Sequence, residues 1–146
     1  MTTDLRPATE RDKAFLITLQ RDAYREVVRA QFGVWDDEYQ AANFERKWLS
    51  SDYQIVEQDG HRIGALAVSR EPDHLRLREI QLLSSHRNRG IGTALILRLT
   101  EEATAAGLPL RLRVLTANRA KALYERIGFQ VTGMHADTHY WMERAP

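Results

Sequence analysis

Two glycines and two arginines lie between a predicted strand and a predicted helix, in a pattern that suits the binding of a phosphate group. The strand covers residues 75–84, and the segment that follows, residues 86–93, reads HRNRGIGT. Glycine lets the backbone turn sharply and approach a ligand closely, and the free N–H groups at the start of a helix attract anions. Arg87 and Arg89 add positive charge beside them. The segment is therefore a candidate phosphate-binding loop.

The glycine spacing alone does not decide between this function and a structural one. The segment is not a Walker loop, because no Gly-Lys-Ser/Thr follows. It is also a poor dinucleotide fingerprint, because Leu95 stands at the place of the third glycine. The alternative is a loop in which the glycines serve only a tight turn.

The elements that must position this loop follow from hydrophobic periodicity, turn residues and caps. Residues 75, 77 and 79 alternate with residues 76, 78 and 80, and both sets are mixed in polarity, so we expect a central strand with one end near a site. Three strands in a meander, followed by alternating strands and helices, predict an α/β fold around a mixed sheet. Strands are expected at 5–8, 53–57, 61–69, 75–84, 110–115, 129–134 and 138–142, and helices from a Thr9 cap to Gly33, from an Asp36 or Asp37 cap through Trp48, from Ile91 to Gly107 and over 118–127.

Composition narrows the class of protein. The 146 residues are 43% hydrophobic and 28% charged, without repeats or linkers, so we expect one globular domain over residues 1–146. The chain has no cysteine, which excludes a disulfide framework, a thiol nucleophile and Cys-ligated zinc, and favours a cytoplasmic location. A net charge of +1 offers no field for nucleic acid. No segment approaches the roughly 18 apolar residues of a membrane span. We therefore expect neither nucleic acid nor a membrane as a partner.

Two segments resemble the signatures of the GNAT N-acetyltransferases. Arg87-x-x-Gly90-x-Gly92 is similar to the family's Arg/Gln-x-x-Gly-x-Gly/Ala motif, and residues 118–129, NRAKALYERIGF, resemble its second signature. The resemblance implies a GNAT-like α/β fold, with a mixed, mostly antiparallel central sheet flanked by helices and splayed central strands. It also implies transfer of an acetyl group from acetyl-CoA to a primary amine, by direct attack in a ternary complex and without a metal.

The resemblance assigns the acetyl-CoA site residue by residue. Backbone N–H groups of the loop would hold the pyrophosphate, and the arm of the cofactor would lie along strand 75–84 where it splays from strand 110–115. The side-chain amide of Asn118 would lie against the cofactor arm or the adjoining backbone. The cofactor-binding residues expected on this basis are Leu82, Leu83, Ser84, Arg87, Asn88, Arg89, Gly90, Ile91, Gly92, Thr93 and Asn118.

Tyr124 is the first expected catalytic residue. The resemblance places it near the cofactor sulfur, where a phenol with a pKa of about 10 can protonate a thiolate whose conjugate acid has a pKa of about 8.5. The N–H of Leu82 would polarise the thioester carbonyl. The alternative for Tyr124 is a half-buried helix tyrosine that only packs in the core.

Glu79 is the second expected catalytic residue. Some GNAT enzymes carry a glutamate base on the strand corresponding to 110–115, but Arg113 stands at that position here. Glu79 on the preceding strand is then the candidate base, acting directly or through water. The alternative for Glu79 is a salt bridge with Arg76, Arg78 or Arg113.

The sequence does not identify the acceptor, which is expected to be a small amine, a protein α-amino group or a lysine. Residues 31–39 and 134–140 would shape its pocket. His135 and His139 lie on a predicted hairpin without a third ligand, so we expect them to face solvent or substrate. An exposed final strand allows a homodimer. Transfer of another acyl group from CoA, and a CoA-binding module without catalysis, are the alternative functions.

Overall fold

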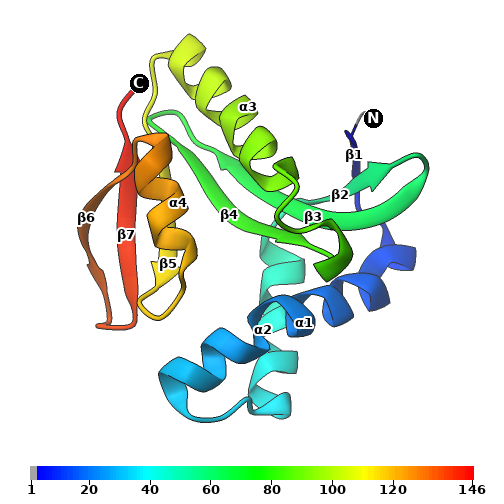
Figure 1. The fold of residues 1–146 in the computed structure, drawn as a ribbon. Helices are drawn as coiled ribbons and strands as arrows, with labels where there is room; N and C mark the ends of the chain where they lie inside the picture. The colour runs from blue at the N-terminus through cyan, green and yellow to red at the C-terminus, as the bar shows by residue number, and fades with distance from the viewer. Residues whose placement is uncertain (1–2) are drawn as a thin grey trace.

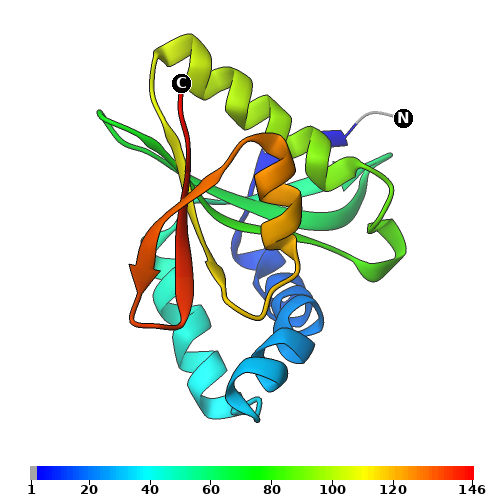
Figure 2. The same cartoon turned by 60° about the vertical axis from the view of Figure 1, so that its left-hand side comes forward.

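A seven-stranded sheet with helices on both faces forms the core of the computed structural model, which describes residues 3–146 (Figures 1 and 2). The strands are β1 Thr3–Pro7, β2 Tyr53–Gln58, β3 His61–Arg70, β4 Leu75–Leu82, β5 Leu110–Leu115, β6 Gln130–His135 and β7 His139–Arg144. The helices are α1 Lys13–Phe32, α2 Asp37–Ser50, α3 Ile91–Ala106 and α4 Ala120–Ile127, with short 3₁₀ turns at Glu10–Asp12 and Ser84–His86. The elements expected from the sequence are confirmed; Met1 and Thr2 of the expected domain lie outside the described residues.

The sheet has the order β1-β2-β3-β4-β5-β7-β6, so β4 is central as expected. Within residues 3–146, every neighbouring pair of strands is antiparallel except β4 and β5. These two are paired only at Leu75–Leu110 and Arg76–Arg111, and they diverge from there (Figure 1). The predicted mixed, mostly antiparallel sheet with splayed central strands is therefore confirmed. The expectation of an exposed final strand is wrong, because β7 is paired with β5 on one side and with β6 on the other, and β6 forms the edge of the sheet. The homodimer stays a prediction.

Two clusters of apolar side chains fill the two sides of the sheet. Leu95 and Leu99 of α3 pack on one face against β5 and β7 residues such as Leu112 and Met142. Leu16 and Leu19 of α1 pack on the other face with residues from α2, β2 and β3. α1 and α2 therefore cover the face of the sheet opposite to α3.

A β-bulge in β4 changes which of its side chains share a face. Ala67 of β3 is paired with Glu79 and the next residue, Val68, with Leu77, so Arg78 is an extra residue in β4. Leu77 packs on the α3 side, whereas Glu79 contacts α1 and α2. Strict alternation would have placed Glu79 on the same face as Leu77. The bulge moves its carboxylate to the opposite face.

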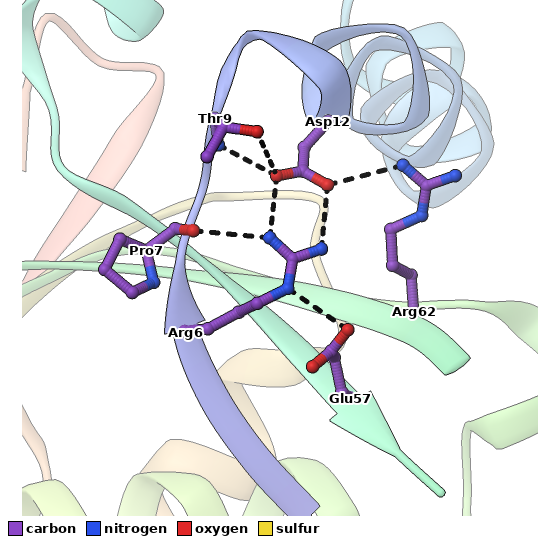
Figure 3. A network of polar contacts seen from close by, with 6 residues as sticks. All are labelled: Arg6, Pro7, Thr9, Asp12, Glu57 and Arg62. Atoms are coloured by element: carbon purple, nitrogen blue, oxygen red, sulfur yellow. Dashed lines mark hydrogen bonds and ion pairs between the residues drawn. The ribbon is translucent and has the colours of Figure 1, made fainter. Parts of the chain in front are cut away.

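A network of charged groups fixes the beginning of α1 (Figure 3). The guanidinium of Arg6 donates two hydrogen bonds of 2.9 Å to the carboxylate of Asp12 and contacts Glu57 at 3.1 Å. Arg62 lies 3.3 Å from the same carboxylate, which also accepts the N–H of Thr9 at 2.8 Å. These donors, the Arg6 hydrogen bonds above all, hold the pKa of Asp12 well below its usual value. The capping pair predicted at Thr9 and Asp12 is therefore confirmed.

Candidate active site

The loop before α3 presents free backbone N–H groups at one point. Gly90 caps α3 with φ +79°, a left-handed conformation that favours glycine. The N–H of Ala94 donates to the carbonyl of Gly90 at 2.9 Å and begins the helical ladder. The N–H groups of Ile91, Gly92 and Thr93 precede it, so the helix supplies no carbonyl for them. A Cβ added at Gly92 would meet only the Leu82 side chain, at 3.8 Å, so the protein itself does not crowd this side.

Arg87 connects this loop to the end of β4. Its Nε donates to the carbonyl of Leu82 at 3.0 Å. Its Nη2 is buried and has no hydrogen-bond partner among the described residues. A buried donor without an acceptor is costly, and an anion beside it removes that cost. Together with the three amides of α3, this arrangement fits a pyrophosphate.

The open edge of β4 faces the gap between the splayed strands. The N–H of Leu83 donates to the carbonyl of Ile63 on β3 at 2.8 Å. Because backbone groups alternate in direction along a strand, the N–H of Leu82 points to the other side. The arm of a ligand can add to this edge as a further strand. Leu83 packs partly in the α1 and α2 cluster, and Ser84 is exposed at the start of a 3₁₀ turn.

The remaining predicted cofactor residues surround this gap. Asn88, with φ +60°, and Arg89 are exposed on the loop. The side-chain oxygen of Asn118 accepts the N–H of Ala120 at 2.9 Å and thereby caps the beginning of α4. Its NH₂ group remains available for a ligand or for neighbouring backbone.

Tyr124 lies at the same gap, on the buried side of α4. Its ring is 9% exposed and packs edge-on against Phe129 at 5.8 Å. Burial, followed by the charge of Glu79, raises the pKa of Tyr124 to about 12. The phenol is therefore protonated throughout the neutral range and can donate a hydrogen bond.

Glu79 is buried among polar groups from α1, α2 and its own strand. The side chain is 7% exposed, and one carboxylate oxygen lies 2.7 Å from Nζ of Lys47. The other oxygen accepts from Nε2 of Gln81 at 2.8 Å and from the hydroxyl of Tyr24 at 3.3 Å. Burial, and then the charge of Glu79, raises the pKa of the Tyr24 phenol well above its usual value. These contacts hold the carboxylate in one orientation.

The arginines expected to pair with Glu79 make other contacts, so that alternative names the wrong partner. Arg78 donates to the side chain of Ser69. Arg76 and Arg113 lie against the ring of Trp141, at 4.9 Å and 6.0 Å from its centroid. Lys47 reaches Glu79 from α2, because the bulge at Arg78 turns the carboxylate to the side of the sheet that α2 covers.

A cavity of about 550 Å³ lies beside Glu79, whereas none of the predicted cofactor residues from Leu82 to Thr93 lines it. It is bounded by α1, α2, the turn between β6 and β7, and residues 76–80 of β4 and 112–115 of β5, which are the two sides of the gap. Tyr124, Glu79 and Asn118 all line it. Members of the segments 31–39 and 134–140 line this cavity. That the cavity receives the acceptor stays a prediction.

The comparisons with known proteins agree with this architecture. Residues 17–129 match the model of the Acetyltransferase (GNAT) family. The chain belongs to the GNAT family of acetyltransferases. The predicted family is therefore confirmed.

Individual relatives of this GNAT chain are more distant. It is 32% identical to N-acetyltransferase family 8 member 3 of Rattus norvegicus over 103 aligned residues. The aligned region covers 63% of this chain and 45% of the rat protein. In fold it is similar to the PaiA N-acetyltransferase of Thermoplasma acidophilum in complex with coenzyme A (TM-score 0.78, 19% identity, 100% of both chains). It is also similar to a GNAT acetyltransferase of Elizabethkingia anophelis with acetyl-CoA bound (TM-score 0.66, 13% identity, 99% and 98% covered).

The structure of this GNAT chain adds site residues that the sequence did not identify. Gln20, Tyr24 and Val28 lie at four-residue spacing on one face of α1 and line the cavity. Polar residues at helical spacing within the apolar face of α1 are the sequence signal by which they could have been found. Gln31 extends the same face: its Nε2 donates to the carbonyl of Thr138 at 2.7 Å, and its Oε1 accepts the N–H of Ala117 at 3.0 Å. α1 is thus tied to the hairpin that closes the cavity.

The two histidines of the last hairpin face each other at this site. The rings of His135 and His139 are 5.8 Å apart. Burial, followed by the charges of Arg113, His135 and Lys47, lowers the pKa of His139 to about 4. In the described part of the chain, no group of three or more His, Cys, Asp or Glu residues is placed to hold a metal ion. Nor does any helix over residues 3–146 have both the length and the hydrophobicity of a membrane span.

Proposed function

We propose that this chain transfers the acetyl group of acetyl-CoA to a primary amine, by direct attack in a ternary complex. The observation that carries the proposal is that Tyr124 and Glu79 line one cavity, which the splayed strands β4 and β5 border. Amine and thioester can then meet in the gap, with an acid and a base already in its walls. The acceptor is a small molecule or a protein amine.

Acetyl-CoA is the co-substrate that fits the loop and the strand edge. The N–H groups of residues 91–93 and the unpartnered Nη2 of Arg87 would hold the pyrophosphate. The N–H groups on the free edge of β4 would bind the pantetheine arm, and the NH₂ of Asn118 would reach it from the start of α4. Both neighbouring structures described above contain CoA or acetyl-CoA, which supports this assignment.

The chemistry uses each of these groups once. The amine nitrogen forms a bond to the thioester carbon while the bond from that carbon to sulfur breaks, giving an amide and free CoA. Glu79 takes the proton that the amine must lose, directly or through water. The N–H of Leu82 stabilises the negative charge that develops on the carbonyl oxygen, and the Tyr124 phenol donates to the departing thiolate.

The release of free thiol from acetyl-CoA, measured with a panel of amines, tests this proposal. Amine-dependent turnover supports the transferase. A chain that binds acetyl-CoA, with a raised Tm, but releases no thiol with any amine is a binding module. Faster turnover with a longer acyl-CoA than with acetyl-CoA would show that another acyl group is transferred.

A further inference from the structure

The cavity next to Glu79 carries a concentration of positive charge that the proposed transfer does not use. The chain as a whole has a net charge of +1. Among the described residues that line the cavity, however, Glu79 supplies the one carboxylate, against five cationic side chains. These cations are Arg46, Lys47, Arg76, Arg78 and Arg113.

Four of these cations have no carboxylate partner in the described structure, and two of the four, Arg46 and Arg78, donate to the side chains of Asn43 and Ser69. Lys47 is neutralised by Glu79 at 2.7 Å. Arg76 and Arg113 instead lie against the ring of Trp141, and the Nε of Arg76 is buried without a hydrogen-bond partner in the described structure. Arg111, which shares its face of β5 with Arg113, shows the contrast: its Nε bonds the carboxylate of Glu143 at 2.8 Å. Arg76 and Arg113 therefore line the cavity with positive charge that no carboxylate of the described residues neutralises.

The surroundings of these arginines favour an anion. Burial, followed by the nearby charges of Arg78 and Arg113, lowers the pKa of Arg76 to about 10. After burial, the charge of Arg113 also lowers the pKa of His139, which lines the same cavity. Arg76 is half-buried with an unpartnered Nε, and Arg113 is exposed beside it. An unpartnered guanidinium donor is stabilised when a carboxylate accepts from it, and the planar fork of arginine fits a carboxylate well.

From the Arg78 bulge, which places Arg76 and Glu79 on one face of β4, and from the open donor of Arg76, we infer that the acceptor is an amine that also carries an oxyanion. The class is that of the amino acids: Arg76 and Arg113 bind the oxyanion, and the amine faces Glu79. The inference rests on the proposed acetyl transfer. The amine forms the amide bond, CoA leaves with its sulfur, and the oxyanion is not consumed.

Matched acceptors that differ only in this group test the inference. The alanine series is alanine, alaninamide, ethylamine and 1-aminoethylphosphonate; the phenylalanine series is phenylalanine, phenylalaninamide and phenethylamine. A third series repeats the comparison on lysine. kcat/KM is measured by thiol release at saturating acetyl-CoA. In a series that the enzyme accepts, we expect kcat/KM for the carboxylate member to exceed that for its amide and its amine by roughly 10- to 100-fold, mostly through a lower KM. The phosphonate distinguishes a site for carboxylates from a site for phosphates.

Three variants assign the preference to the proposed residues. In Arg76→Gln and Arg113→Gln the preference for the anion should fall toward onefold, while turnover of the neutral amine is retained. Arg111→Gln is the matched control on the same strand and should keep the preference. Binding of N-acetylalanine to the CoA-loaded protein, measured by calorimetry, should weaken in the first two variants only, which gives a readout apart from activity.

The outcomes separate this inference from the proposed function. Amines acetylated without regard to the oxyanion, or a preference that survives both substitutions, would overturn the inference and leave the acetyltransferase standing. A preference that Arg111→Gln abolishes equally would show a general charge effect and also overturn it. If no amine of any series is acetylated while acetyl-CoA binds, the proposed function fails and the inference fails with it.

Discussion

Replacing Tyr124 with Phe separates the catalytic role of this residue from its role in packing. The substitution removes one hydroxyl and keeps a ring that is 9% exposed and packs edge-on against Phe129. Stability should therefore change by less than about 1 kcal/mol. The cofactor loop belongs to α3 and β4, so affinity for acetyl-CoA should also be retained.

The magnitude of the effect on turnover follows from the environment of the phenol. General acid catalysis contributes about 10²–10⁴-fold. Burial, with the charge of Glu79 second, raises the pKa of Tyr124 to about 12, which makes the phenol a weaker acid toward a thiolate whose conjugate acid has a pKa of about 8.5. Donation of a hydrogen bond to the departing thiolate is then favoured over complete early transfer. We expect kcat to fall by roughly 10²-fold, or about 2.7 kcal/mol.

The assay compares wild type and Tyr124→Phe with two acyl donors. With acetyl-CoA, thiol release at saturating amine gives kcat, and calorimetry gives the affinity for the donor. With a thioester of a more acidic thiol, the deficit should shrink, because that thiolate needs less help in leaving. A variant that binds acetyl-CoA normally and turns over within a few-fold of wild type with both donors would show that Tyr124 only packs.

Three further substitutions test the rest of the site and the fold. Gly92→Val should keep the fold, since a Cβ there meets only Leu82 at 3.8 Å, but lose acetyl-CoA affinity by calorimetry; retained affinity in a folded variant would place the phosphate elsewhere. Glu79→Gln should lower kcat at saturating amine, and a near-normal rate would show that Glu79 is not the base. Asp12→Asn should lower the free energy of unfolding by about 3 kcal/mol at pH 7 in urea melts, because Arg6 and Arg62 lose a carboxylate that is 3% exposed. The folded-state pKa of Asp12 lies below its unfolded value because Arg6 donates to it, so this deficit should be full above about pH 4 and shrink as the pH falls; a deficit that does not depend on pH would contradict it.

The sequence predicted the fold wherever a local rule determines the backbone. Asp59 and Gly60 both take positive φ in the turn between β2 and β3, the backbone conformation that an Asp-Gly pair between two strands favours. Asp36 accepts the N–H of Tyr39 at 3.1 Å and caps α2, which decides between the two expected caps. Gly107 ends α3 in the left-handed conformation. In each of these places the conformation is determined by residues that lie within four positions of one another in the sequence.

The polar surroundings of Glu79 could not be predicted, because they depend on tertiary contacts between distant segments. Tyr24 lies 55 residues from Glu79 in the chain, and Lys47 reaches the carboxylate from another helix. A register shift leaves no mark in the polarity of β4, so period-two alternation gave no sign of the bulge at Arg78.

The bulge and the splay of β4 each change a different part of this strand: the splay frees its edge, and the bulge changes which face carries Glu79. The loss of pairing with β5 after Arg76 frees the edge along which a cofactor arm can lie. The extra residue Arg78 turns the Glu79 carboxylate from the α3 side to the side of α1 and α2, where the cavity is. Without the bulge, Glu79 would be placed among the leucines of the α3 cluster, at the cost of burying a charge. Without the splay, the carboxylate would be separated from Tyr124 by a continuous sheet. Both departures from regular β structure are therefore needed for one cavity to be lined by the Tyr124 phenol from α4 and the Glu79 carboxylate from β4.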